Sequence, residues 1–73
     1  MIQINDRFYK ENTVVMIENI TGSDDIRRGK YKFTIRFNLG NGVIIEDKAY
    51  FEHIDTAKDV RDNLVNHISD INF

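Results

Sequence analysis

The chain has 73 residues, a net charge of −2 and no cysteine, and 41% of its residues are hydrophobic. This length allows one domain at most, and the absence of cysteine excludes disulfides and thiolate metal sites. The apolar fraction is too high, and the net charge too low, for an intrinsically disordered protein. We therefore expect one small domain spanning residues 1–73.

The sequence contains no targeting or membrane-spanning pattern. Met1–Lys10 lacks the apolar stretch of a secretory signal peptide, and no segment approaches about 18 consecutive apolar residues. We therefore expect a cytoplasmic protein that does not bind membranes. The frequent residues Ile, Asn, Lys, Asp, Phe and Tyr have codons that lean toward A and T, which suggests a bacterial or phage genome.

The N-terminal part of the chain predicts short strands and a loop. Met1–Ile4 and Arg7–Tyr9 are expected to form a short strand or hairpin at the edge of a sheet. Thr13–Ile20 is rich in β-branched residues, which favours another strand. Thr21–Gly29 is polar, with two glycines and an acidic pair, and is expected to be a long loop.

The clearest pattern lies in the middle of the chain. Apolar and polar residues alternate over Tyr31–Leu39, which is typical of a strand with one buried face. The tripeptide Gly40–Gly42 then signals a hairpin, and Val43–Phe51 is expected to form its second strand.

The pairing of these two strands depends on the length of the turn. A two-residue turn of Asn41 and Gly42 would set Phe37 against Glu46, whereas a three-residue turn keeps apolar residues opposite one another. We therefore expect the three-residue turn, with Gly42 in the left-handed region of a bulge. Asp47 falls on the apolar face, where it marks a second bulge, an edge or an interface. The expected facing pairs are Leu39 with Val43, Phe37 with Ile45, Arg36 with Glu46, Phe33 with Ala49, and Tyr31 with Phe51.

The C-terminal segment predicts a helix that begins at Thr56. Thr56 and Asp59 have the spacing of a capping box, and Asp55 is an alternative cap. Phe73 is expected to close one end of the core. An apolar stripe at helical spacing, which should pack on the apolar face of the sheet, consists of Ala57, Val60, Leu64, Ile68 and Ile71.

Together these elements predict an α+β fold, an antiparallel β-meander of three to four strands with one C-terminal helix packed on one face. One helix covers only one face of the sheet, and small domains with a half-covered sheet often dimerise. We therefore also expect a homodimer.

The residues that catalysis or metal binding requires are few. Ser69 and His67 lie two apart on the predicted helix, so they point in different directions. His67 and Asp70 share a helix face, but we expect His67 to flank the apolar stripe and His53 to lie in the strand–helix turn. No glycine-rich phosphate loop is present. We expect a protein that is not an enzyme and has no cofactor or metal.

Basic residues gather in the predicted loop and on the outward face of the hairpin, where an aromatic residue joins them. A basic sheet surface with an aromatic side chain is one way to hold single-stranded nucleic acid. Glu46 among these residues and the acidic net charge favour a solvated or protein-binding face instead. The predicted partner-binding residues are Arg27, Arg28, Lys32, Arg36, Lys48 and Tyr50.

The order of Thr13–Ile20, Phe33–Phe37, the Asn41-Gly42 turn and the helix resembles that of small flagellar FlbD-type proteins. The resemblance lies in the alternation and the helix, and it transfers no functional residue.

Small size, missing catalytic groups and codon bias lead to an expectation about function. We expect a non-enzymatic protein-interaction module, an accessory protein of a phage or mobile element that inhibits a host defence nuclease such as a CRISPR effector. One alternative is a nucleic-acid-binding protein that uses the basic outer face of the central hairpin. The other is a small regulatory subunit of a bacterial assembly.

Overall fold

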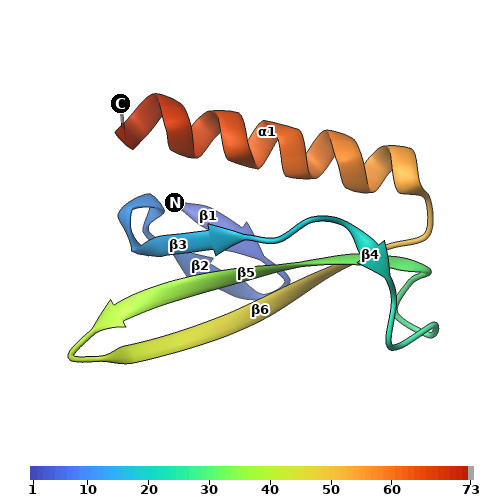
Figure 1. Cartoon of the computed structure of the whole chain (residues 1–73), viewed down its shortest axis with the longest axis horizontal. Helices are drawn as coiled ribbons and strands as arrows, with labels where there is room; N and C mark the ends of the chain where they lie inside the picture. Colours follow the sequence, from blue (N-terminus) through green and yellow to red (C-terminus); the bar gives the residue numbers. More distant parts are fainter. Residues whose placement is uncertain (73) are drawn as a thin grey trace.

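The computed structural model describes residues 1–72 of the chain and the side chains of residues 1–69. An antiparallel sheet is covered on one face by the C-terminal helix, with a small N-terminal hairpin beneath the helix (Figure 1). The predicted α+β fold with one C-terminal helix is confirmed. The elements are β1 (Ile2–Ile4), β2 (Arg7–Tyr9), the 3-10 turn η1 (Glu11–Thr13), β3 (Val14–Ile17), β4 (Thr21–Gly22), β5 (Tyr31–Gly40), β6 (Val43–Phe51) and α1 (Ile54–Asn72).

The main sheet is built around β5. β6 pairs with one side of β5, while β3 and β4 pair in succession with the other side. The predicted strand Thr13–Ile20 is therefore shorter than expected. Thr13 ends the 3-10 turn, where its N–H and hydroxyl both donate to the carbonyl of Lys10. The predicted loop Thr21–Gly29 begins with β4, because Thr21 and Gly22 pair with β5.

The β5–β6 hairpin closes differently from the prediction. Asn41 and Gly42 form a two-residue turn with positive φ angles of 54° and 77°, a geometry that matches the twist of the strands. Gly40 pairs with Val43, and a bulge at Leu39 restores the register from Asn38 onward. The expected three-residue turn and the pairing of Leu39 with Val43 are therefore wrong. The other four expected pairs are confirmed: Phe37 with Ile45, Arg36 with Glu46, Phe33 with Ala49, and Tyr31 with Phe51.

The helix begins at Ile54, two residues before the predicted start. The N–H of Ala57 donates to the carbonyl of His53 at 3.2 Å, so Thr56 lies inside the first turn rather than at its cap. Ala57 is fully buried, and Leu64 and Ile68 pack against the core, as the stripe predicted. The prediction is wrong for Val60, which is 40% exposed because it faces an open hollow beside β1 rather than the core. The expected contacts of the Ile71 and Phe73 side chains lie outside the described residues.

The core lies between the helix and the inner face of β5, and the N-terminal hairpin completes it. Phe33, Ile35 and Phe37 are the largest fully buried side chains. β1 and β2 pair only with each other and form a separate small sheet, rather than an edge of the main sheet as predicted. Their residue Tyr9 stacks on Phe37 with 3.7 Å between ring centroids. The hairpin therefore covers part of the core face beside the helix.

The position of Asp47 on the apolar face is explained by this hairpin. Asp47 pairs with Ile35 without interruption of the register, so it does not mark a bulge. Its carboxylate accepts hydrogen bonds from the Tyr9 hydroxyl at 3.0 Å and from the Asn5 side-chain amide at 3.1 Å. Asp47 thus lies on an edge strand, where the N-terminal hairpin meets β6.

Candidate interaction surface

The face of the main sheet opposite the helix carries most of the predicted partner-binding residues. We call it the outer face. Because alternate residues of a strand point to opposite faces, the residues between buried Phe33, Ile35 and Phe37 point outward. The outer face consists of Lys32, Thr34, Arg36 and Asn38 from β5, Ile44, Glu46, Lys48 and Tyr50 from β6, and Met16 from β3.

One end of the outer face is covered by the loop Ser23–Lys30, which folds back on itself. The Ser23 N–H donates to the Lys30 carbonyl at 2.9 Å and closes the base of the loop. Inside it, the Arg28 N–H donates to the Asp25 carbonyl at 3.0 Å, and the Asp25 N–H donates to the Ser23 hydroxyl at 2.9 Å. These local bonds hold the loop in one shape.

Asp24 fastens this loop to β6. Its carboxylate accepts hydrogen bonds from Lys48 Nζ at 3.0 Å and from the Tyr50 hydroxyl at 2.9 Å. These two bonds lower the pKa of Asp24 to about 2, and the bond from Lys48 has the larger effect. The hydrogen bond to Asp24 also raises the pKa of Lys48. The pKa of Tyr50 is raised by desolvation and by its hydrogen bond to Asp24. The Arg28 guanidinium lies 4.3 Å from the centre of the Tyr50 ring, a cation–π contact.

The other end of the outer face contains a second set of paired charges. Arg36 Nε lies 3.2 Å from Glu46 Oε2, and Arg36 Nη2 lies 3.3 Å from Glu18 Oε1. Arg36 Nη1 also lies 3.4 Å from the sulfur of Met16. Arg36 is thus held by carboxylates from β6 and from the segment that follows β3.

The predicted site residues therefore fall into distinct groups. Arg28, Lys48 and Tyr50 gather around Asp24, while Arg36 belongs to the second cluster and Arg27 is exposed on the loop. The remaining residue, Lys32, is half-buried opposite Tyr50. Sequence reasoning missed the two carboxylates that hold these cations, Asp24 and Glu18. No local pattern identifies them, because their partners lie far away along the chain.

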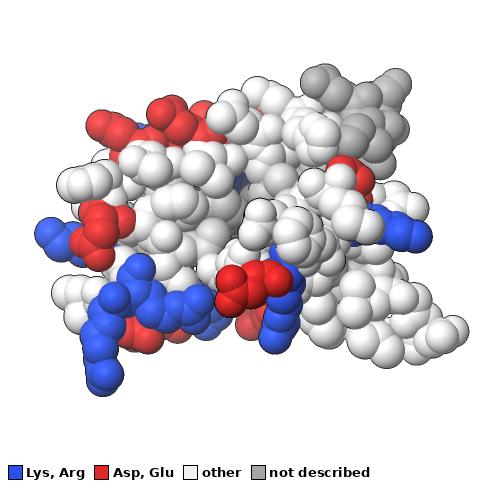
Figure 2. Space-filling view, turned by 180° about the vertical axis from the view of Figure 1, so that it is seen from behind, with Lys and Arg blue, Asp and Glu red and all other residues white. Residues whose placement is uncertain are grey.

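Exposed apolar residues lie at the far end of the outer face and at the tip of the hairpin. Ile44 is 60% exposed and Met16 is 47% exposed. At the tip, Leu39 and Val43 are also about half exposed, and no charged residue occurs from Asn38 to Ile45. Figure 2 shows the tip as a charge-free protrusion at the lower right, whereas charged side chains gather at the opposite end.

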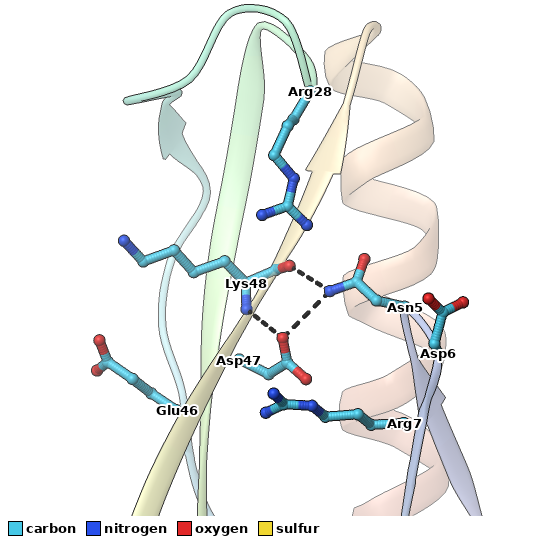
Figure 3. Close-up of a pocket in the computed structure, with 7 residues that line it drawn as sticks. All are labelled: Asn5, Asp6, Arg7, Arg28, Glu46, Asp47 and Lys48. Atoms are coloured by element: carbon cyan, nitrogen blue, oxygen red, sulfur yellow. Dashed lines mark hydrogen bonds between the residues drawn. The ribbon is translucent and has the colours of Figure 1, made fainter.

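A hollow of about 380 Å³ lies beside the edge of β6 (Figure 3). Its lining mixes cations and carboxylates, so it favours neither an anion nor a cation. The lining residues are Asn5, Asp6, Arg7, Arg28, Glu46, Asp47 and Lys48.

Within the described part of the chain, no three His, Asp or Glu side chains are grouped to hold a metal ion. His67 Nε2 instead lies 3.4 Å from a carboxylate oxygen of Glu11. Among residues 1–72, no helix has both the length and the apolar character needed to cross a membrane.

Comparison with known proteins finds no relative. No family model matches the chain, and no curated protein or solved structure is significantly similar to it.

Proposed function

We propose that this protein is a non-enzymatic interaction module that binds another protein through its outer face. The observation that supports this function is the contrast between paired charges and exposed apolar groups. Arg36 and Lys48 already have carboxylate partners, whereas Ile44 and Met16 remain exposed beside them. Protein interfaces combine an apolar centre with a polar rim in this way.

The same contrast argues against nucleic-acid binding as the main function. Binding to phosphates requires cations that are free to replace counterions, but Arg36 and Lys48 are neutralised within the chain. Base stacking requires a free aromatic face, but Arg28 covers one face of the Tyr50 ring. Exposed Arg27 is the feature that supports this alternative. Binding that weakens steeply with added salt would distinguish it from a protein contact.

The partner class that follows from chain size and codon bias is a host defence nuclease, such as a CRISPR effector. A small regulatory role in a bacterial assembly is the alternative. Both require the same surface, so one experiment on the outer face tests the shared proposal. A cleavage assay with purified defence nucleases, with and without the protein, then separates the two.

The outer face is tested with Met16→Glu. This change replaces an exposed apolar side chain with a carboxylate, which can still contact Arg36. The matched control is Phe8→Glu, which replaces a 64% exposed residue of β2 on the helix side of the sheet. We expect a bacterial protein captured by the wild type and by Phe8→Glu to be lost with Met16→Glu. If Met16→Glu retains that protein as well as the wild type does, the outer face is not the binding surface.

A further inference from the structure

The β6 strand has an edge that no other described strand covers. β6 pairs with β5 on one side only. In an antiparallel strand, the main-chain N–H and C=O groups of every second residue point away from the neighbouring strand. Lys48 is one of these residues, since its carbonyl accepts a hydrogen bond from Asn5 in the N-terminal hairpin. By the same alternation, Glu46 and Ile44 direct their main-chain groups toward the open edge.

Part of this edge is closed by the chain itself. Asn5 Nδ2 donates to the Lys48 carbonyl at 2.9 Å, and the Lys48 N–H donates to Asp47 Oδ1 at 3.0 Å (Figure 3). The Asn5 amide thus occupies the place where an added strand would donate. The edge is therefore open from Gly42 to Glu46, on the turn side of Lys48.

Three consecutive residues of the open stretch, Val43–Ile45, carry none of the features that usually protect an edge strand. Natural edges are guarded by charges, proline or bulges on the edge strand. Val43, Ile44 and Ile45 are consecutive β-branched residues, and Val43 and Ile44 are 49% and 60% exposed. The nearest charge along β6 is Glu46, at the limit of the stretch. This segment is therefore suited to pairing with another strand.

We propose that the open stretch Gly42–Glu46 pairs antiparallel with the same stretch of a second copy, about a two-fold axis at Ile44. This axis sets Ile44 against its copy on the outer face and Val43 against Ile45 on the inner face. Glu46 then faces Gly42, which has no side chain. Each copy donates an Ile44 N–H to the Ile44 carbonyl of the other.

Registers shifted toward the C-terminal end of β6 are disfavoured by the sequence and by the closed part of the edge. An axis at Ile45 sets Val43 against Asp47, and an axis at Glu46 sets two like charges opposite each other. An axis at Asp47 requires the Lys48 edge, which Asn5 already closes. Only the axis at Ile44 centres the pairing on the open stretch.

The dimer joins two β5–β6 hairpins into one continuous sheet and places two outer faces side by side. Its contact is short compared with a stable interface, which buries about 800 Å² on each partner. Self-association is therefore weak, with a dissociation constant on the order of 0.1–1 mM. This self-association uses the β6 edge and Ile44, which also belongs to the outer face, whereas Met16 lies in β3 on the opposite side of β5. The Met16→Glu variant therefore tests the proposed function without changing the β6 edge.

Sedimentation equilibrium at protein concentrations from about 10 µM to about 1 mM, a range that includes the expected dissociation constant, tests the proposal. We expect a concentration-dependent monomer–dimer equilibrium for the wild type and a monomer for Ile44→Lys, because two like charges then meet at the axis. The matched control is Leu39→Lys, which adds the same charge at a 51% exposed position on β5. It should dimerise like the wild type. An unchanged thermal unfolding curve should show that each variant is folded.

A mixing experiment tests the register itself. Ile44→Lys and Ile44→Glu should each be monomeric alone but should form a heterodimer when mixed, because only an axis at Ile44 brings the two changed positions together. The proposal would be overturned if the wild type remained monomeric at about 1 mM, which is on the order of the expected dissociation constant. Loss of the dimer in Leu39→Lys, or no heterodimer on mixing, would overturn it as well. None of these results changes the expected loss of capture with Met16→Glu.

Discussion

The main chain of Gly29 passes so close to Phe51 that a Cβ atom on Gly29 would lie 2.7 Å from the Phe51 nitrogen. Gly29 is buried, and its N–H bonds to the Asp25 carbonyl at 3.3 Å. The end of the loop Ser23–Lys30 is thus in backbone contact with the end of β6. Phe51 in turn stacks on Phe33, with 5.7 Å between ring centroids, so this contact continues into the core.

Gly29→Ala should destabilise the protein, because the added methyl group meets backbone atoms that cannot rotate away. We expect the free energy of unfolding to fall by about 1–3 kcal/mol in urea denaturation. Gly22→Ala is the matched control, since no atom lies within 4 Å of its added Cβ. Its effect should stay within about 0.5 kcal/mol. Equal stability of the two variants would show that the close approach is relieved at little cost.

The bonds from Tyr9 and Asn5 to Asp47 hold the N-terminal hairpin against β6. Asp47→Ala should lower the free energy of unfolding by about 1–3 kcal/mol, because it leaves the partly buried Tyr9 hydroxyl without its acceptor. Tyr9→Phe keeps the ring that stacks on Phe37 and should cost only about 0.5–1.5 kcal/mol. Asp62→Ala, at an exposed helix position, is the control and should be nearly neutral. If Asp47→Ala is as stable as this control, the hairpin does not depend on Asp47.

Arg61 connects the helix to the gap between β3 and β4. Its Nε donates to the Glu18 carbonyl at 2.7 Å, and its Nη2 donates to the Asn19 side-chain oxygen at 3.2 Å. Arg61→Met keeps most of the apolar stem but removes both donors, so the free energy of unfolding should fall by about 1.5–3 kcal/mol. Lys58→Met, at an exposed position of the same helix, should change it little. Equal urea midpoints for the two variants would contradict this role.

The central hairpin and the helix were predictable because their signals are local. Alternation over Tyr31–Leu39 requires only neighbouring residues, and the helical stripe from Ala57 to Ile68 has a regular period. The turn was misjudged because the bulge at Leu39 corrects the register, and its position depends on how the two strands twist together. The position of the N-terminal hairpin was missed because the contact of Tyr9 with Phe37 is tertiary.

The site residues were predictable only as a list of basic residues and one tyrosine. A basic outer face follows from the alternation of Lys32, Arg36 and Lys48 along the strands. Whether those charges are free depends on carboxylates elsewhere in the chain. Asp24 reaches Lys48 across 24 positions, and no periodic pattern encodes such a contact. The fold therefore shows that two of the cations on this face, Arg36 and Lys48, are paired with carboxylates.

Asp24 should titrate well below its usual pKa of 3.8, at about 2, because Lys48 and Tyr50 donate to its ionised carboxylate. A carboxyl group whose pKa is lower in the folded state stabilises the protein above its unfolded pKa. This contribution is therefore complete above about pH 5 and is lost as the pH falls through about 2. NMR titration of the Asp24 carboxyl carbon measures the pKa directly, and the Tyr50 ring signals should move with it as the loop detaches.

Lys48→Met tests the cause of this shift, since it removes the stronger donor and leaves Tyr50 in place. The pKa of Asp24 should rise toward 3.8 in this variant, and the loop should detach at a higher pH. Lys32→Met is the matched control, because Lys32 lies opposite Tyr50 on the same face but does not donate to Asp24. An Asp24 that titrates near 3.8 in the wild type would mean that the loop is not fastened to β6 in solution. The outer face would then be more open, and Lys48 would be free to bind a partner.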